Sequence, residues 1–151
     1  MITKTEVGTI FNGFKQSYIY VWVSKQHRVV YVGMTNSRTG VLGRAVGHVG
    51  ENGTLRKRVV ENKGFPLEWI ADFNVLSFPL PSERIYYSLE RSYREAVEYL
   101  VQKELIKMRG KLIPSYDVIS WVRNNPRTSN SDVIREANKI VIAFVNRYPL
   151  L

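Results

Sequence analysis

Two short runs of β-branched and aromatic residues, separated by a few polar residues, constrain the fold of this chain more than any other feature. Residues 17–24 read SYIYVWVS and residues 29–33 read VVYVG, with the polar segment 25–27 between them. β-Branched and aromatic side chains favour strands, and two such runs joined by a short turn indicate a β-hairpin. The predicted fold is therefore built outward from this hairpin.

The rest of the chain shows helical patterns and one further strand. Residues 34–53 are expected to be loop with a short helix at 42–48, and a helix over 54–63 should end at Gly64. Residues 67–78 predict a third strand. Ser82 should cap a long helix over 83–109 that stops at Gly110. Two helices are expected after it, over 114–123 and over 132–147, the last capped by Ser129 or Ser131.

This order predicts an α+β fold, in which a small three-stranded antiparallel sheet is flanked by helices in the order β-β-α-α-β-α. The length of 151 residues suits one compact core. We expect that core, with an N-terminal lead-in, to occupy residues 1–117. Residues 118–151 should form a helical extension that packs on the core or forms a homo-oligomer interface.

The chain is basic and contains no cysteine. It has 22 Lys and Arg against 13 Asp and Glu, a formal net charge of +9, and two histidines. Such a charge indicates a polyanionic partner, either nucleic acid or an anionic membrane surface. Thiolate chemistry is excluded, so a bound metal should have oxygen ligands, which favours magnesium or manganese. The absence of a bilayer-length apolar run and of a signal-peptide pattern predicts no membrane insertion and a cytoplasmic or nuclear location.

Residues suited to phosphodiester chemistry occur in three groups. Tyr20 and Tyr31 lie on the hairpin strands, Arg44 and His48 are one helical turn apart, and the long helix carries several carboxylates. Hydrolysis of a phosphodiester requires a positioned water, a cation that offsets the phosphate charge, and carboxylate oxygens that hold a metal. These groups can supply all three requirements.

Glu104 is the first candidate among the carboxylates. It is four residues from both Leu100 and Met108, so it is expected in the same row as the apolar stripe of the long helix. An inward-facing carboxylate is costly unless a cation or a basic side chain pairs with it. Both pairings are open on periodicity alone, and Glu98 and Glu95 are the reserves.

The hairpin sequence resembles the GIY-YIG nuclease family. The first family motif appears as residues 18–20, YIY, and the second as residues 31–33, YVG. Tyr18 stands where the family has glycine, and Val32 stands where it has isoleucine. The resemblance covers about two thirds of the chain, residues 17–117, and includes the predicted order of elements.

Further along the chain the resemblance continues residue by residue. The arginine and histidine of the family match Arg44 and His48, and its metal-binding glutamate matches Glu104, ahead of Pro114. Asp117 stands where the family has asparagine. The resemblance implies that one magnesium or manganese ion is held by Glu104, with Asp117 as a second candidate ligand.

The resemblance also implies roles for the other residues. Tyr31 and Tyr20 would orient or deprotonate the attacking water, Arg44 would bind the phosphate, and His48 would support the site. The expected function is a divalent-metal-dependent endonuclease that hydrolyses DNA, with RNA as an alternative substrate. The rival is a non-catalytic nucleic-acid-binding module, in which the last two helices form a helix-turn-helix-like unit.

Each residue also has a structural reading. The tyrosines are typical sheet aromatics, Gly33 is either a strand-end glycine or a point of close phosphate approach, and Asp117 is either a ligand or a helix cap. Arg38 is the alternative to Arg44, because the stretch from Tyr31 to Arg44 is long for the family. A basic run provides either a solvated face or contacts to backbone phosphates: Arg56, Lys57 and Arg58.

Overall fold

The predicted hairpin is the centre of the structure. In the computed structural model, which describes residues 15–121 and 123–151, β1 (Tyr18–Ser24) pairs antiparallel with β2 (Val29–Thr35) along its whole length. β1 also pairs antiparallel with β3 (Asn74–Pro79), so β1 is an interior strand. The predicted lead-in lies almost entirely outside the described residues.

A fourth strand corrects the predicted sheet. β4 (Asp117–Val118) pairs parallel with Val29 and Val30 of β2, which gives a mixed sheet of strand order β3-β1-β2-β4. The α+β class is confirmed, but the three-stranded antiparallel sheet and the helix over 114–123 are wrong. The amides of Asp117 and Ile119 donate to the carbonyls of Arg28 and Val30, both at 2.9 Å. Residues 117 and 118 therefore form a strand against the open edge of β2, although the spacing of apolar residues around them predicted a helix.

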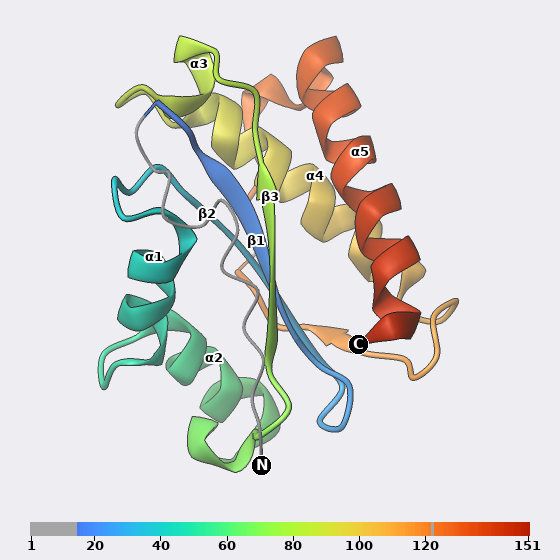
Figure 1. The fold of residues 1–151 in the computed structure, drawn as a ribbon. Coiled ribbons are helices and arrows are strands. Elements are labelled where there is room, and N and C mark those ends of the chain that lie inside the picture. Colours follow the sequence, from blue (N-terminus) through green and yellow to red (C-terminus); the bar gives the residue numbers. More distant parts are fainter. Residues whose placement is uncertain (1–14, 122) are drawn as a thin grey trace.

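Helices cover both faces of the sheet, so the molecule has three layers (Figure 1). α1 (Gly40–Val49) and α2 (Thr54–Lys63) lie on one face, and α2 ends at Gly64 with the left-handed φ of 74° that its sequence predicts. α4 (Ser92–Met108) and α5 (Ser131–Arg147) lie on the other face. Short 3₁₀ turns complete the chain: η2 (Leu67–Trp69), η3 (Pro126–Ser129) and η4 (Tyr148–Leu150).

The long helix predicted over 83–109 is interrupted. It consists of α3 (Arg84–Tyr87) and α4, with a non-helical connection between them. The guanidinium of Arg94 donates to the carbonyls of Tyr86, Ser88 and Glu90, at 2.7, 2.7 and 3.3 Å. These hydrogen bonds satisfy main-chain acceptors that a continuous helix would have used, which makes the break tolerable.

Two other element boundaries differ from the prediction. The third strand is confined to residues 74–79, because the chain after Pro66 forms η2. α5 is capped by Asn130, whose side chain accepts from the amides of Asp132 and Val133, and not by Ser129 or Ser131.

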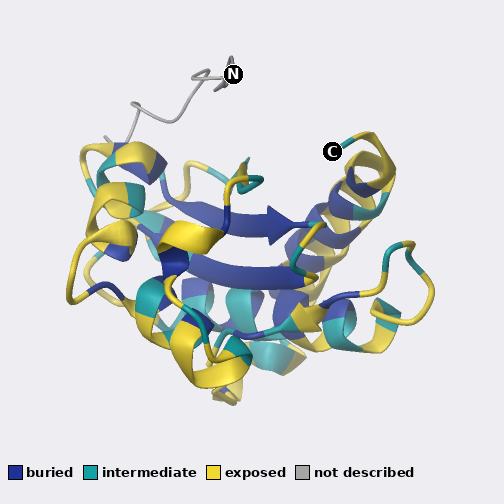
Figure 2. Cartoon of the chain, turned by 90° about the horizontal axis from the view of Figure 1, so that it is seen from below, coloured by how far each residue is buried: buried dark blue, intermediate teal, exposed yellow. Residues whose placement is uncertain are grey.

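The two faces of the hairpin differ in composition. Strands place successive side chains on opposite faces, and Figure 2 shows both long strands buried. The face against α4 and α5 is aliphatic and carries Ile19, Val21, Val23, Val30 and Val32. The face against α1 and α2 is largely aromatic and carries Tyr18, Tyr20, Trp22, Val29 and Tyr31.

The C-terminal segment packs on α4. α5 buries one row of side chains in the same cluster as the aliphatic face of the sheet, namely Val133, Ala137, Ile140 and Phe144. The helix-turn-helix-like arrangement is wrong, because the segment expected to be its first helix contains β4, and none of its described residues lies in a helix. Within residues 15–121 and 123–151, no helix has both the length and the hydrophobicity that a membrane span requires.

Candidate active site

A pocket lies along the edge of β2 that β4 leaves uncovered. β4 pairs only with Val29 and Val30, so the edge beyond them borders a cavity of about 310 Å³. Its walls come from β2, from the N-terminal half of α4 and from the segment after β4. They include Tyr31, Glu95, Glu98, Gln102, Trp121 and Arg123.

Tyr20 and His48 form a buried pair beside this pocket. The Tyr20 hydroxyl is hydrogen-bonded to Nε2 of His48, and both residues are 2% exposed. Burial and the nearby Arg44 charge lower the pKa of His48 to about 4, so the ring is neutral at pH 7. We assign the Tyr20 hydroxyl as the donor, which leaves the ring proton of His48 on Nδ1.

Gly33 makes room for Tyr20. The two residues are direct partners across the hairpin, and a Cβ at Gly33 would overlap the hydroxyl end of the Tyr20 ring. Glycine is therefore required at position 33 because the phenol of Tyr20, on the neighbouring strand, comes close to its backbone. Gly33 thereby fixes the direction in which Tyr20 reaches His48.

Tyr31 is the tyrosine that borders the pocket. Its ring centroid lies 5.3 Å from that of His48, and within the described residues its hydroxyl forms no hydrogen bond with the protein. Burial and Glu98 raise the pKa of Tyr31 to about 12, while Arg44 and Arg58 act in the opposite direction. Burial is the largest cause that raises the pKa of Tyr20, and the neighbouring Tyr31 is the second. Both phenols are therefore neutral at pH 7.

Glu98 is the carboxylate that faces these tyrosines. Burial and the neighbouring Glu95 raise the pKa of Glu98 to about 8, and Arg44 and Arg91 oppose that shift. The Glu98 side chain accepts a hydrogen bond from Nε2 of Gln102 at 3.2 Å. A carboxylate with a raised pKa in a cleft is a recurrent feature of functional sites.

Glu104 does not join this cluster. It forms an ion pair with Lys107 at 2.6 Å, and its side chain is 36% exposed. It follows Glu98 by six residues, which is ~9 Å along a helix and on another side of it. The expectation of an inward-facing Glu104 is wrong, because the row of Leu100 and Met108 is itself only partly buried. The buried row of α4 runs through Val97, Val101 and Leu105.

Arg44 reaches the cluster and Arg38 does not. Arg44 lies on α1, one turn before His48, and shifts the pKa values of Tyr20 and Glu98. Arg38 is exposed in the loop before α1 and lines a different hollow. The arginine that lies near Tyr20 and Glu98 is therefore Arg44, the one that matches the order of the family motifs.

Asp117 lies apart from the pocket. It begins β4 and pairs with Lys63 at 2.7 Å, with 61% of its side chain exposed. Asp117 begins a strand, and the next helical element among the described residues starts only at Pro126, so the capping interpretation is wrong. Asp117 pairs with Lys63 and lies away from the pocket, so its position does not support a role as a metal ligand there.

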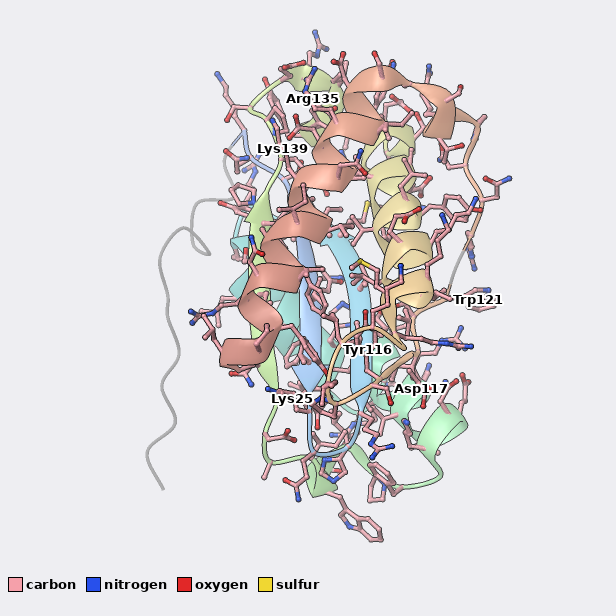
Figure 3. The ribbon with its side chains drawn as sticks, turned by 90° about the vertical axis from the view of Figure 1, so that its right-hand side faces the viewer. Lys25, Tyr116, Asp117, Trp121, Arg135 and Lys139 are labelled. Atoms are coloured by element: carbon pink, nitrogen blue, oxygen red, sulfur yellow. The ribbon has the colours of Figure 1, made fainter. Side chains whose placement is uncertain are left out.

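The basic run is divided among three environments. Arg56 pairs with Glu68 at 2.5 Å, and Lys57 is exposed. Arg58 lies with its guanidinium carbon 4.5 Å from the ring centroid of Trp121, at the pocket. Arg123 contacts the same ring at 4.6 Å, and Figure 3 shows Trp121 at the outer edge of the molecule.

The sequence interpretation missed some pocket residues and ranked others second. Trp121 and Arg123 fall in the segment assigned to a helix, and Glu98 and Glu95 were only the reserves for Glu104. A signal for a shared polar row exists on α4, where four residues recur at helical spacing: Arg91, Glu95, Glu98 and Gln102. Among the described residues, no three His, Asp or Glu side chains gather as a metal-binding group.

Comparisons with protein-family models, with curated proteins and with solved structures find no match to this chain.

Proposed function

We propose that the protein is a divalent-cation-dependent endonuclease of the GIY-YIG type, which hydrolyses phosphodiester bonds in DNA at the open edge of β2. One observation carries the proposal: residues from four elements lie close together. Tyr31 and Glu98 line one pocket, the Tyr20–His48 pair packs beside Tyr31, and Arg44 is near enough to shift the pKa values of Tyr20, Tyr31 and Glu98. The formal charge of +9 suits a polyanionic substrate.

The donor set of the pocket fits a hard divalent cation. Glu98 and Glu95 are three residues apart on one helix, and side-chain amides of Gln102 and Asn125 lie against them at 3.2 and 3.4 Å. Oxygen donors of this kind suit magnesium or manganese, which retain several waters. Burial is the main cause of the raised pKa of Glu98, and a bound cation would lower that pKa and favour the carboxylate. When bound there, the cation would supply positive charge beside the scissile phosphate.

Tyr31 is the residue that handles the attacking water. Its hydroxyl borders the pocket, whereas Tyr20 is committed to His48. With a pKa of about 12, Tyr31 orients the water as a neutral phenol in the ground state. Tyr31 can act as a base only as the phenolate, after it has lost its own proton, and the positive charges of Arg44 and Arg58 favour that form.

Arg44 and the Tyr20–His48 pair complete the site. The planar Arg44 guanidinium suits two phosphate oxygens and offsets the charge that develops on them. Neutral His48 fixes the Tyr20 hydroxyl, which in turn keeps the polar side of the hairpin rigid. Tyr20 and His48 are thus positioning residues for Tyr31 and Arg44.

The test is cleavage of a labelled DNA duplex and a labelled single strand, with magnesium or with EDTA. Wild type should cut only with magnesium, and Glu98→Gln should cut ~10²–10³-fold more slowly. Glu104→Gln is the matched control from the same helix and should cut like wild type. Equal loss in both variants, or cutting in EDTA, would overturn the proposal.

The second candidate is a nucleic-acid-binding module without catalysis. It is favoured by Trp121, which is 62% exposed between Arg58 and Arg123, because aromatic and arginine side chains stack on bases. It predicts salt-sensitive binding of DNA or RNA that is unchanged by EDTA, and no cleavage under any condition.

A further inference from the structure

A second pocket lies next to the candidate active site and has a different chemistry. Its volume is about 380 Å³ and it is lined by side chains that are basic or neutral, without a carboxylate. We call it the arginine pocket, after Arg44, Arg91 and Arg94; its other polar lining residues are Thr35, Asn36 and Ser37. Met34 and Arg91 line both pockets, so the two are contiguous.

Arg94 is the unusual member of this set. It is 1% exposed, and all three acceptors of its guanidinium are main-chain carbonyls. Its Nε has no hydrogen-bond partner, and no carboxylate of the described residues forms an ion pair with it. A buried cation without a counter-ion is costly, and an unpaired buried donor adds to that cost. The protein therefore holds a positive charge here that an anion from outside could balance.

The start of α1 adds to the positive potential. Gly43 and Arg44, near the start of this ten-residue helix, line the arginine pocket. α1 has no side-chain cap and no acidic residue in its first turn, so no negative side chain there offsets the partial positive charge of its N-terminal end. An anion is therefore favoured by the guanidinium groups of Arg44 and Arg94, by Arg91, which also pairs with Glu95, and by one helix terminus.

We infer that the arginine pocket binds a phosphate group of the substrate strand, namely the one adjacent to the scissile phosphodiester. This inference rests on the proposed function, because only a nucleic-acid strand would present phosphates to both pockets. The carboxylate-bearing pocket would receive the phosphate that is cut, and the arginine pocket would fix the position of its neighbour. Phosphate contacts of this kind set register without reading sequence.

The first part of the test uses inorganic phosphate in EDTA, without DNA. The side-chain Nε–H resonances of Arg94 and Arg91 are followed by ¹H–¹⁵N NMR during the titration, with sodium chloride of equal ionic strength as reference. We expect the Arg94 signal to shift saturably in wild type and in Glu98→Gln. Arg91→Gln should weaken phosphate binding about tenfold. An Arg94 signal that responds equally to chloride and phosphate overturns the inference.

The second part uses DNA in EDTA and a matched arginine. Arg91 is 66% exposed and pairs with Glu95, and Arg135 on α5 is 55% exposed and pairs with Asp132, so both substitutions remove one exposed, paired charge. Figure 3 shows Arg135 near the top of the view, away from Trp121 at the right edge. Arg91→Gln should weaken DNA binding about tenfold and reduce the salt slope by about 1, whereas Arg135→Gln should change neither.

A neutral methylphosphonate placed at each linkage in turn then locates the contact. In wild type, the linkage next to the cut should weaken binding, and in Arg91→Gln the same linkage should have no further effect. If the methylphosphonate at that linkage weakened binding by the same factor in Arg91→Gln as in wild type, the inference would be overturned even if the protein cuts DNA. Conversely, phosphate binding at Arg94 without any cleavage would leave the arginine pocket in place and refute the nuclease.

Discussion

The two faces of the β1–β2 hairpin use the same strands for different purposes. Toward α4 and α5 the side chains are aliphatic, closely packed and free of polar atoms. Toward α1 and α2 they are aromatic, and two of them carry hydroxyls that belong to a polar cluster with His48. Alternation along a strand thus separates a face that stabilises the fold from a face that carries the proposed chemistry.

The difference shows why the pocket lies at an edge. Glu98 belongs to α4, on the aliphatic side, and Tyr31 points to the aromatic side. They can meet only where no strand intervenes, which is the stretch of β2 beyond Val30 that β4 does not cover. Substitutions on the aromatic face should therefore affect cleavage, and substitutions on the aliphatic face should affect stability.

The largest effect is expected from Tyr31→Phe. Cleavage should fall by ~10²–10⁴-fold, the range for loss of a group that transfers or orients a proton. The free energy of unfolding should change little, because the Tyr31 hydroxyl makes no hydrogen bond within the described residues. Single-turnover cleavage and urea unfolding measure the two quantities. Near wild-type cleavage by Tyr31→Phe, with loss in Tyr20→Phe, would exchange the roles of the two tyrosines.

The next largest effect is on the aliphatic face. Leu105→Ala empties a fully buried position of α4 and should lower the free energy of unfolding by ~2–5 kcal/mol. The cleavage rate per folded molecule should stay the same, measured well below the melting temperature. Leu100→Ala, at a partly buried position of the same helix, should cost less. A rate loss in Leu105→Ala that exceeds its unfolded fraction would contradict the separation of the faces.

A pH effect on stability should follow from His48. Its pKa is about 4 in the folded protein against 6.5 in an unfolded chain, so the unfolded state binds a proton more strongly. This contribution is fully present above pH 6.5 and is lost as the pH falls toward 4, by about 3 kcal/mol. The comparison is urea unfolding of wild type and His48→Gln at pH 7.5 and 4.5. The variant should lose less stability on acidification, and parallel losses would exclude a buried neutral His48.

The smallest effect is expected from Asp117→Asn. The pair with Lys63 is solvent-exposed, and such pairs contribute ~0–1 kcal/mol. Cleavage should be unchanged, because Asp117 does not line the pocket. A large rate loss here, measured under the same single-turnover conditions, would restore Asp117 as a ligand and would require the segment after β4 to move.

The sequence predicted what depends on local pattern and missed what depends on distant contacts. Alternation and turn residues predicted β1 and β2, and Gly64 marked the end of α2. β4 could not be predicted, because residues 117 and 118 become a strand only by pairing with β2. The buried row of α4 was also missed, because periodicity describes one helix, and which row is buried depends on the layers around it.

The central claim is that a divalent cation binds at Glu98, beside Tyr31. Manganese binding measures this directly, because the ion broadens NMR signals of nuclei close to it. Substoichiometric manganese should first broaden the side-chain amide of Gln102 and the ring of Tyr31, and Glu98→Gln should abolish this. Glu104→Gln should retain it. Broadening centred on Glu104 and Lys107, or a pattern that survives in Glu98→Gln, would contradict the claim.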